Sequence, residues 1–173
     1  MAETKRLRET NLPMQGPSRR SLGERLTTRL AHFGYLLMRP MTLGVRGAVI
    51  DRDDRVLLVK HTYVAGWHLP GGGVEIGETC ERALTRELSE EANVVLEAPP
   101  LLHGLFLNAH VSRRDHVAVY VVRRFRVTAE RAPDREIVAA RFFDRDALPP
   151  DATRATRARL DEILAGAPIS ALW

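Results

Sequence analysis

The chain of 173 residues contains a single cysteine, Cys80, so an internal disulfide is excluded. A lone thiol is typical of proteins from a reducing compartment, and we expect a cytoplasmic protein. No apolar run approaches the roughly 20 residues that a membrane-spanning helix needs, so no integral membrane segment is expected. The basic N-terminus also lacks the continuous apolar core of a secretory signal. A zinc site is not indicated either, because the histidines show no suitable spacing (His61, His103, His110 and His116).

Most of the chain carries no excess of positive charge, although the formal net charge of the whole chain is +4. Residues 1–40 hold eight Lys or Arg and three acids, so this segment carries +5 and residues 41–173 carry −1. The charge balance of the larger part argues against nucleic-acid binding by the whole chain. A hydrophobic content of 45% is enough for the core of one domain with an appendage.

The N-terminal 40 residues divide into two segments. Residues 1–20 are polar, contain Pro13 and Pro17, and are expected to be a flexible basic arm. Residues 21–40 predict an amphipathic helical extension, because apolar side chains recur at helical spacing at Leu22, Leu26, Leu30, Phe33 and Leu37. We expect this helix to pack on the domain or on a second subunit, which would give a homodimer. A peripheral membrane helix and an organelle presequence are the alternatives.

Residues 41–173 are rich in strand-forming runs and are expected to form one domain. The runs 42–50 and 55–62 are separated by the turn signal DRDD and predict a β-hairpin. Helices are predicted over 81–92 and 151–166. Four further strands are predicted, over residues 94–98, 101–107, 116–128 and 136–143, with 116–128 the longest. This composition favours an α/β fold with a mixed β-sheet between helices.

Three glutamates crowd one side of the predicted helix 81–92. Glu87, Glu90 and Glu91 fall within an arc of about 100° at helical periodicity. Glu91 also borders the apolar stripe of Leu84 and Leu88, where an unpaired carboxylate is costly. A hard divalent cation removes both penalties, because Mg²⁺ and Mn²⁺ prefer oxygen ligands. Alone, however, such a cluster is much more often a solvated helix face.

A glycine run lies just before this helix. Gly71, Gly72 and Gly73 follow Pro70 and cannot form a helix or the interior of a strand. They predict a loop whose backbone lets a ligand or an ion approach closely, and Thr79 is a candidate cap for the helix that follows. The loop and the acidic helix at this separation are far more specific together than either is alone.

The combined stretch resembles the signature of the Nudix hydrolases, G-x5-E-x7-R-E-U-x-E-E-x-G-U, where U is a bulky aliphatic residue. The matching residues are Gly72, Glu78, Arg86, Glu87, Leu88, Glu90, Glu91 and Val94. Asn93 stands where the family has glycine, and asparagine is the residue that best tolerates a left-handed helix end after glycine. We therefore expect a small change in stability and no loss of chemistry. With the flanking segments WHLPGG and EIVAARFF, the resemblance covers roughly residues 42–165.

The resemblance implies a Nudix-type α/β/α sandwich and a metal site within it. The implied ligands of Mg²⁺, or of Mn²⁺ as a substitute, are the carboxylates of Glu87, Glu90 and Glu91 and the carbonyl of Gly71. Glu78 and Arg86 would pair and orient the helix against its loop. A further carboxylate often comes from outside the signature, and we choose Glu136 over Asp134 and Glu130. An exposed strand charge is the alternative role for Glu136.

The implied reaction is hydrolysis of a pyrophosphate bond in a nucleoside diphosphate linked to a moiety X, with water attacking phosphorus. The general base is left open among Glu87, Glu91 and Glu136. Two alternatives remain. One is an RNA 5′-pyrophosphohydrolase or decapping-type enzyme that uses the basic arm, and the other is a nucleotide-sensing regulator without activity. Because every acidic position of the signature is present, an enzyme is favoured over a sensor.

Substrate-binding residues are harder to assign. Tyr63, Trp67 and His68 precede the glycine loop and could line a base or sugar pocket, although core packing is the commoner role for a tryptophan. Arg123 and its basic neighbours could hold an anionic substrate, with a solvated surface as the alternative. The stretch 108–111 has neither the proline nor the tyrosine that mark the ADP-ribose and dinucleoside polyphosphate subgroups of the family.

Overall fold

The computed structural model describes residues 40–173. The arm predicted for residues 1–20 lies outside this part of the chain, and so does the helical extension predicted for 21–40, apart from Pro40. The homodimer assigned to that extension therefore stays a prediction. No helix within residues 40–173 is both long and apolar enough to cross a membrane.

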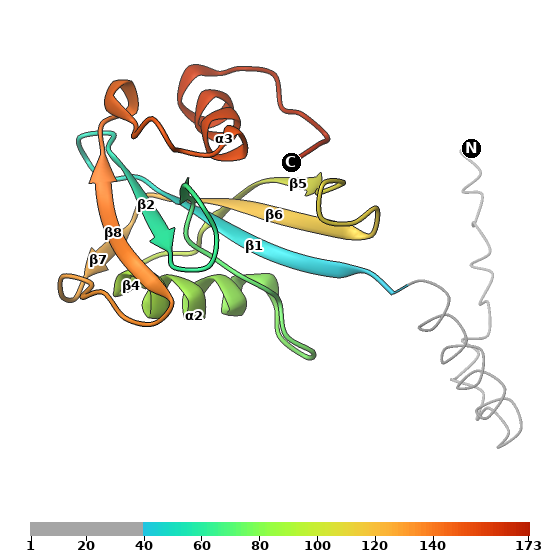
Figure 1. The fold of residues 1–173 in the computed structure, drawn as a ribbon, viewed down its shortest axis with the longest axis horizontal. Coiled ribbons are helices and arrows are strands. Elements are labelled where there is room, and N and C mark those ends of the chain that lie inside the picture. Colours follow the sequence, from blue (N-terminus) through green and yellow to red (C-terminus); the bar gives the residue numbers. More distant parts are fainter. Residues whose placement is uncertain (1–39) are drawn as a thin grey trace, which may run out of the picture. The chain divides into compact units, whose positions relative to one another are not determined.

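The strands of the described part form three small sheets (Figure 1). The first has the order β1-β6-β5 and is mixed, because β1 is parallel to β6 and β5 is antiparallel to it. Its strands are β1 (Thr42–Val49), β5 (Leu101–Leu107) and β6 (Asp115–Val122).

The other two sheets are antiparallel. In one, β2 (Val56–His61) lies between β3 (Trp67–His68) and β8 (Ile137–Phe143). The other pairs β4 (Val94–Leu96) with β7 (Phe125–Val127). The strands predicted at 94–98, 101–107 and 136–143 are thus confirmed within one or two residues at their ends.

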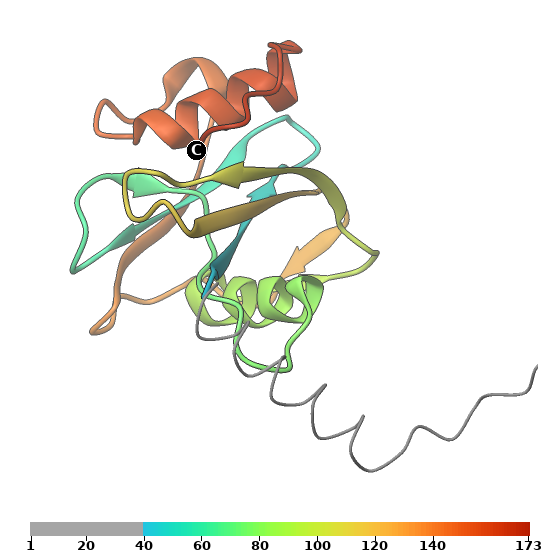
Figure 2. The same cartoon turned by 90° about the vertical axis from the view of Figure 1, so that its right-hand side faces the viewer.

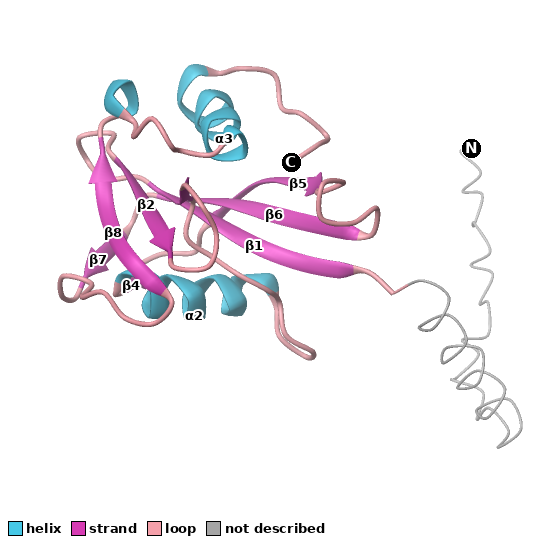
Figure 3. Ribbon diagram, viewed as in Figure 1, coloured by secondary structure: helices cyan, strands magenta, loops and turns pink. Residues whose placement is uncertain are grey.

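Helices cover opposite faces of the strands (Figures 2 and 3). The helix α2 (Cys80–Ala92) packs on one side, and α3 (Arg154–Ala165) on the other, preceded by the short helix η1 (Arg145–Ala147). Residues of β1 supply both interfaces. Val45 and Val49 join the core under α2, whereas Ala48, and Ile50 just after the strand, join the core that contains Leu160 of α3. The expected α/β fold, with mixed β-structure between helices, is present.

Local signals set both ends of α2 and the C-terminal end of α3 as predicted. The Thr79 side chain accepts a hydrogen bond from the backbone of Arg82, and Asn93 closes α2 in the left-handed conformation with φ 53°. Gly166 closes α3 in the same way, with φ 69°. The start of α3 is later than expected, because Thr153 is its cap.

The predicted β-hairpin between residues 42–50 and 55–62 is wrong. The turn is present, with Asp54 at φ 57°, but a single bridge between Ile50 and Val56 joins the two strands. Beyond it, β1 and β2 enter different sheets. The reason is that both edges of β1 are already occupied. One edge pairs with β6, and the other bonds to the glycine loop, where the Val45 amide donates to the carbonyl of Gly72 at 2.8 Å.

The predicted strand at 116–128 is two strands instead of one. It breaks at Arg123 and Arg124, between β6 and β7. Residues before the break pair with β1 and β5, whereas residues after it pair with β4. A change of sheet requires a change of chain direction, which a continuous apolar pattern in the sequence does not reveal.

Candidate active site

The glycine loop is fixed along the edge of β1. The amide of Gly47 donates to the carbonyl of Pro70 at 2.8 Å, and the amide of Val74 to that of Leu43 at 2.9 Å. Gly71 has φ +138°, and a Cβ there would lie 2.2 Å from the carbonyl oxygen of Val45. Only glycine fits at that point, so the sequence GGG lets the loop backbone lie directly against the strand.

Helix α2 packs closely against the same strand. A Cβ on Gly47 would lie 3.1 Å from Leu84 and 3.2 Å from Leu88, so the missing side chain admits the leucine stripe of the helix. This packing carries the carboxylates of α2 to the loop. The amide of Gly71 donates to Oε2 of Glu91 at 2.7 Å. A Cβ on Gly72 would lie only 2.4 Å from Oε1 of Glu87.

Glu91 is a buried carboxylate, with 8% of its surface exposed. Burial raises its pKa to about 7, against the opposing effects of the Gly71 amide and the positive charge of Arg46. His61 faces it, with Nε2 3.5 Å from Oε1. Burial, followed by the charges of Arg46 and His68, lowers the pKa of His61 to about 4. Burial thus disfavours the charged form of both groups.

Arg46 reaches from β1 over the same loop. Its Nη1 donates to the carbonyl of Leu69 at 3.1 Å and also to the carbonyl of Gly71. Burial lowers the pKa of Arg46, while the negative charges of Glu91 and Glu87 oppose that change. A guanidinium thus lies against the backbone oxygen that was expected to bind a metal.

Arg86 joins three glutamates of the signature. Its expected pair with Glu78 is present, with Nη2 3.1 Å from Oε2. Its Nη1 donates to Glu87 at 2.7 Å and lies 3.5 Å from Glu90. The hydrogen bonds to Glu78 and Glu87 raise the pKa of Arg86, and Arg86 lowers the pKa of Glu78. A bond from Nη2 to the Gly73 carbonyl at 3.1 Å completes the link from helix to loop.

Glu90 is not gathered with the other two glutamates of the helix. Its side chain is 62% exposed, and Arg86 is its partner at 3.5 Å. The backbone carbonyl of Glu90 also accepts a bond from Arg131 at 2.9 Å. In this conformation the group near the loop therefore consists of Glu87 and Glu91, and Glu90 lies on the exposed rim.

Glu136 lies at the end of the loop that leads into β8. Its backbone carbonyl accepts a bond from the amide of Thr62 at 2.9 Å. Its negative charge contributes to raising the pKa of Glu91 and of Tyr63, which places it in the electrostatic range of the site. The two less favoured candidates have other contacts. Asp134 accepts bonds from the amides of Glu136 and Ile137 and pairs with Arg131, and the carbonyl of Glu130 accepts from Asn93.

The donor chemistry suits a hard divalent cation, although the ligands are not assembled. Within residues 40–173, no three carboxylate, imidazole or thiol groups are grouped closely enough to hold one ion. Nevertheless, the buried carboxylate of Glu91 lies beside Glu87 and a bare loop backbone. All of these groups offer oxygen, which Mg²⁺ prefers. The residues thus fit such an ion once their side chains rearrange.

Of the residues considered for substrate binding, two lie beside His61, which faces Glu91. Tyr63 is 73% exposed, and its ring centre is 5.1 Å from that of His61. His68 lies 5.8 Å from His61, ring centre to ring centre. Trp67 is instead a core residue, 8% exposed and packed edge-on to Phe143, so the core-packing alternative holds for it.

Arg123 is not brought to the glutamates. It pairs with Asp54 in the turn between β1 and β2, at 2.5 Å. This turn follows the C-terminal end of β1. The glycine loop instead bonds to Leu43, Val45 and Gly47, before that end of the strand. A surface pair is therefore its role in the described part of the chain.

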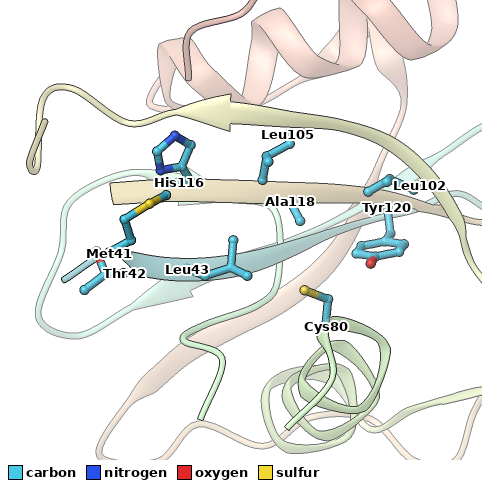
Figure 4. A pocket seen from close by; sticks show the side chains of 9 residues that line it. All are labelled: Met41, Thr42, Leu43, Cys80, Leu102, Leu105, His116, Ala118 and Tyr120. Carbon is cyan, nitrogen blue, oxygen red and sulfur yellow. The ribbon is translucent and has the colours of Figure 1, made fainter. Parts of the chain in front are cut away.

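A separate apolar groove of about 360 Å³ lies over the first sheet (Figure 4). Leu43, Leu105 and Tyr120 line it from the strands, and Cys80 lines it from the start of α2. None of the residues that line it is acidic. The thiol thus lies in an apolar environment, and the groove is distinct from the glutamate site.

Two residues of the site were not identified from the sequence. Arg46 and His61 both lie in strand-forming runs and reach the glutamates only through folding. Arg46 could have been noticed as the charged residue in the apolar run 42–50. A strand that is covered on both faces rarely holds an unpaired charge, so such a residue is expected to have a partner. No comparable signal separated His61 from the other histidines.

Comparisons with known proteins agree with this geometry. The model of the NUDIX domain family matches residues 40–163. An ADP-ribose pyrophosphatase of Methanocaldococcus jannaschii is 33% identical over 118 residues, which cover 66% of this chain and 69% of that protein. A putative 8-oxo-dGTP diphosphatase of Bacillus subtilis is 42% identical over 59 residues, 33% of this chain and 40% of that protein. The crystal structure of a MutT NUDIX hydrolase from Burkholderia pseudomallei has a TM-score of 0.62 at 31% identity, covering 70% of this chain and 97% of that one.

Proposed function

Because the chain belongs to the NUDIX domain family and is a Nudix pyrophosphohydrolase, we propose that it hydrolyses a nucleoside diphosphate joined to a second moiety X. The archaeal relative is named for ADP-ribose and the Bacillus relative for 8-oxo-dGTP. Both compounds are nucleotides with a phosphoanhydride bond. This shared bond, rather than either compound, defines the proposed substrate class.

One observation carries the proposal: Glu87 and Glu91 both approach the Gly71–Gly72 backbone. The Gly71 amide holds Glu91 at 2.7 Å, and the lack of a side chain on Gly72 leaves room for Glu87. A diphosphate repels nucleophiles through its own negative charge, so its hydrolysis needs cations at the reacting phosphorus. Paired carboxylates beside an open backbone are suited to holding such cations.

We assign the metal site to Glu87, Glu91, Glu136 and the carbonyl of Gly71. Glu90 joins them only if it turns away from Arg86. When bound there, Mg²⁺, or Mn²⁺ in its place, neutralises the diphosphate and lowers the pKa of water. The ligand set is formed by oxygens alone, as these hard cations require.

The remaining residues of the site position these groups. Arg86 bonds to Glu87 and to Gly73, so it fixes the helix relative to the loop, and Glu78 holds Arg86 in turn. Water attacks one phosphorus, the bridging P–O bond of the phosphoanhydride breaks and the other phosphate leaves with the electron pair, and one carboxylate among Glu87, Glu91 and Glu136 takes the proton of the water. The exposed ring of Tyr63 offers a surface on which a base or sugar can stack.

The first test is the variant Glu91→Gln. It keeps the shape of the side chain but removes the charge, so we expect turnover to fall on the order of 10²–10⁴-fold. The fold should persist, as measured by circular dichroism, because the amide oxygen still accepts from Gly71. Glu81→Gln is the matched control, since Glu81 lies on an exposed position of the same helix. Near-normal rates in Glu91→Gln would contradict the assignment.

The substrate class is tested by a phosphate-release screen with Mg²⁺ and then Mn²⁺. It compares nucleotide sugars, dinucleotides, nucleoside triphosphates and 5′-triphosphate RNA. We expect the highest kcat/KM among compounds with a nucleoside diphosphate joined to a second group. A preference for RNA that is lost when residues 1–40 are removed would support the RNA 5′-end alternative instead.

A further inference from the structure

Arg46 is a cation at the place where the proposed function requires a metal ion. It extends from β1, and its Nη1 donates to two carbonyls of the glycine loop, those of Leu69 and Gly71. The carbonyl of Gly71 is one of the assigned metal ligands. An arginine bonded to a ligand oxygen is expected to affect how an ion enters the site.

The charges around Arg46 also indicate that it interacts with the glutamates of the site. The negative charges of Glu91 and Glu87 both act on its guanidinium, and Arg46 in turn acts on Glu91 and His61. Gly71 holds both groups, because its amide donates to Glu91 at 2.7 Å and its carbonyl accepts from Arg46. Arg46 is therefore the fixed positive charge that faces the buried carboxylate.

We propose that Arg46 is the resident counter-cation of the metal-free site and competes with the divalent ion. The proposal rests on the proposed function, because it takes Gly71 and the two glutamates as ligands. An arriving ion meets repulsion from the guanidinium and finds the Gly71 oxygen already bonded. The positive charge of Arg46 therefore opposes binding of the ion at that oxygen, and binding becomes easier once the guanidinium has moved away.

A purely structural role for Arg46 predicts the opposite effect. If Arg46 only held the loop in shape, its loss would leave the Gly71 carbonyl poorly oriented, and metal binding would weaken. If Arg46 competes, its loss removes a positive charge from the site, and metal binding becomes tighter. The direction of the change thus separates the two roles.

The experiment measures Mn²⁺ binding to the full chain without substrate, by calorimetry or by the electron spin resonance of the free ion. Arg46→Met removes the charge and keeps most of the length of the side chain, and we expect binding about tenfold tighter than that of the natural chain. Arg46→Lys keeps the charge and should bind Mn²⁺ more weakly than Arg46→Met. Arg52→Met is the control, because Arg52 is exposed in the turn after β1, and its binding should be unchanged.

Equal or weaker binding by Arg46→Met overturns the proposal. If that variant does not fold, the Nε resonance of Arg46 is followed in the natural chain while Mg²⁺ is added, with Arg46→Lys used to assign it. A shift that saturates with the ion supports displacement, and an unchanged resonance at saturation overturns it. If the natural chain binds no Mn²⁺ at all, the proposed metal-dependent function itself fails, whereas a wrong order among the variants rejects only the role of Arg46.

Discussion

The three consecutive glycines of the loop meet three different constraints. Gly71 is required by its φ of +138° and by the carbonyl of Val45, which a Cβ would approach within 2.2 Å. Gly72 is required by the carboxylate of Glu87, and the position of Gly73 has open space, with nothing within 4 Å of a Cβ. The three identical residues therefore differ in what they tolerate. The backbone requires glycine at position 71, the side chain of Glu87 requires it at position 72, and position 73 has room for a side chain.

This difference predicts the effect of single methyl groups. In Gly72→Ala the new Cβ would lie 2.4 Å from Oε1 of Glu87, which is the far end of a flexible side chain. Glu87 can move, so we expect little loss of stability. Its displacement should lower kcat about 10- to 100-fold, because catalytic groups tolerate little misplacement. Gly73→Ala serves as the control, and equal rates in the two variants would show that the position of Glu87 is unimportant.

At the scale of elements, the end of α2 shows how the chain accommodates its departure from the family signature. Asn93 adopts φ 53° and ψ 32°, and its amide donates to the carbonyls of Leu88 and Ser89. Its side chain also donates to the carbonyls of Ala129 and Glu130, at 3.3 and 3.4 Å. A glycine could adopt the backbone conformation but could not make these bonds, so asparagine ties the helix end to the loop that follows β7.

Replacement of Asn93 should therefore separate backbone from side-chain effects. Asn93→Gly loses two weak hydrogen bonds, but glycine adopts the left-handed conformation with less strain. We therefore expect a change within about 1 kcal/mol in the free energy of unfolding. Asn93→Ala loses the bonds and strains the backbone, and should cost about 1–2 kcal/mol. Urea denaturation measures both. Turnover by the folded protein should be unchanged, and a large loss in Asn93→Gly would show that the cap does more than hold the helix end.

At the scale of the whole domain, a buried ionic network ties the C-terminal residues to α3 and β5. Arg159 is 1% exposed, and its guanidinium lies 3.9 Å from the ring centre of Phe106. It donates to Glu162 at 2.6 Å and to the carbonyl of Leu172 at 3.0 Å. Glu162 also contacts His103 of β5 at 2.9 Å. Segments far apart in the chain are thus joined by two buried charges.

Removal of one charge should destabilise the domain. In Arg159→Met, Glu162 is left buried without its partner, and we expect a loss of about 3 kcal/mol in the free energy of unfolding. Arg154→Met is the control in the same helix, since Arg154 is exposed. Folded Arg159→Met should retain turnover, because the network lies on the α3 side and the glutamates on the α2 side. A loss of stability equal to that of the control would exclude the network as a main contributor.

The sequence allowed α2, its two caps and several strands to be predicted, because these depend on neighbouring residues. Glu87 and Glu91 could be placed together for the same reason, since they are four residues apart on one helix. The wrong hairpin has the opposite origin, because the partner of β1 is β6, about 70 residues away. Arg46 and His61 escaped prediction likewise, since Arg46 reaches the glycine loop from β1 and His61 reaches Glu91 from β2.

The pairing of the glycine loop with β1 has a consequence for solubility. Bonds from Val45 and Gly47 to the loop, and from Val74 back to Leu43, satisfy the strand edge that β6 leaves open. An uncovered edge of this kind is a template for intermolecular β-pairing and aggregation. The segment that presents the Gly71 carbonyl therefore also shields the sheet. Substitutions that detach the glycine loop from β1 are therefore expected to have two effects, a loss of catalysis and self-association of the chain.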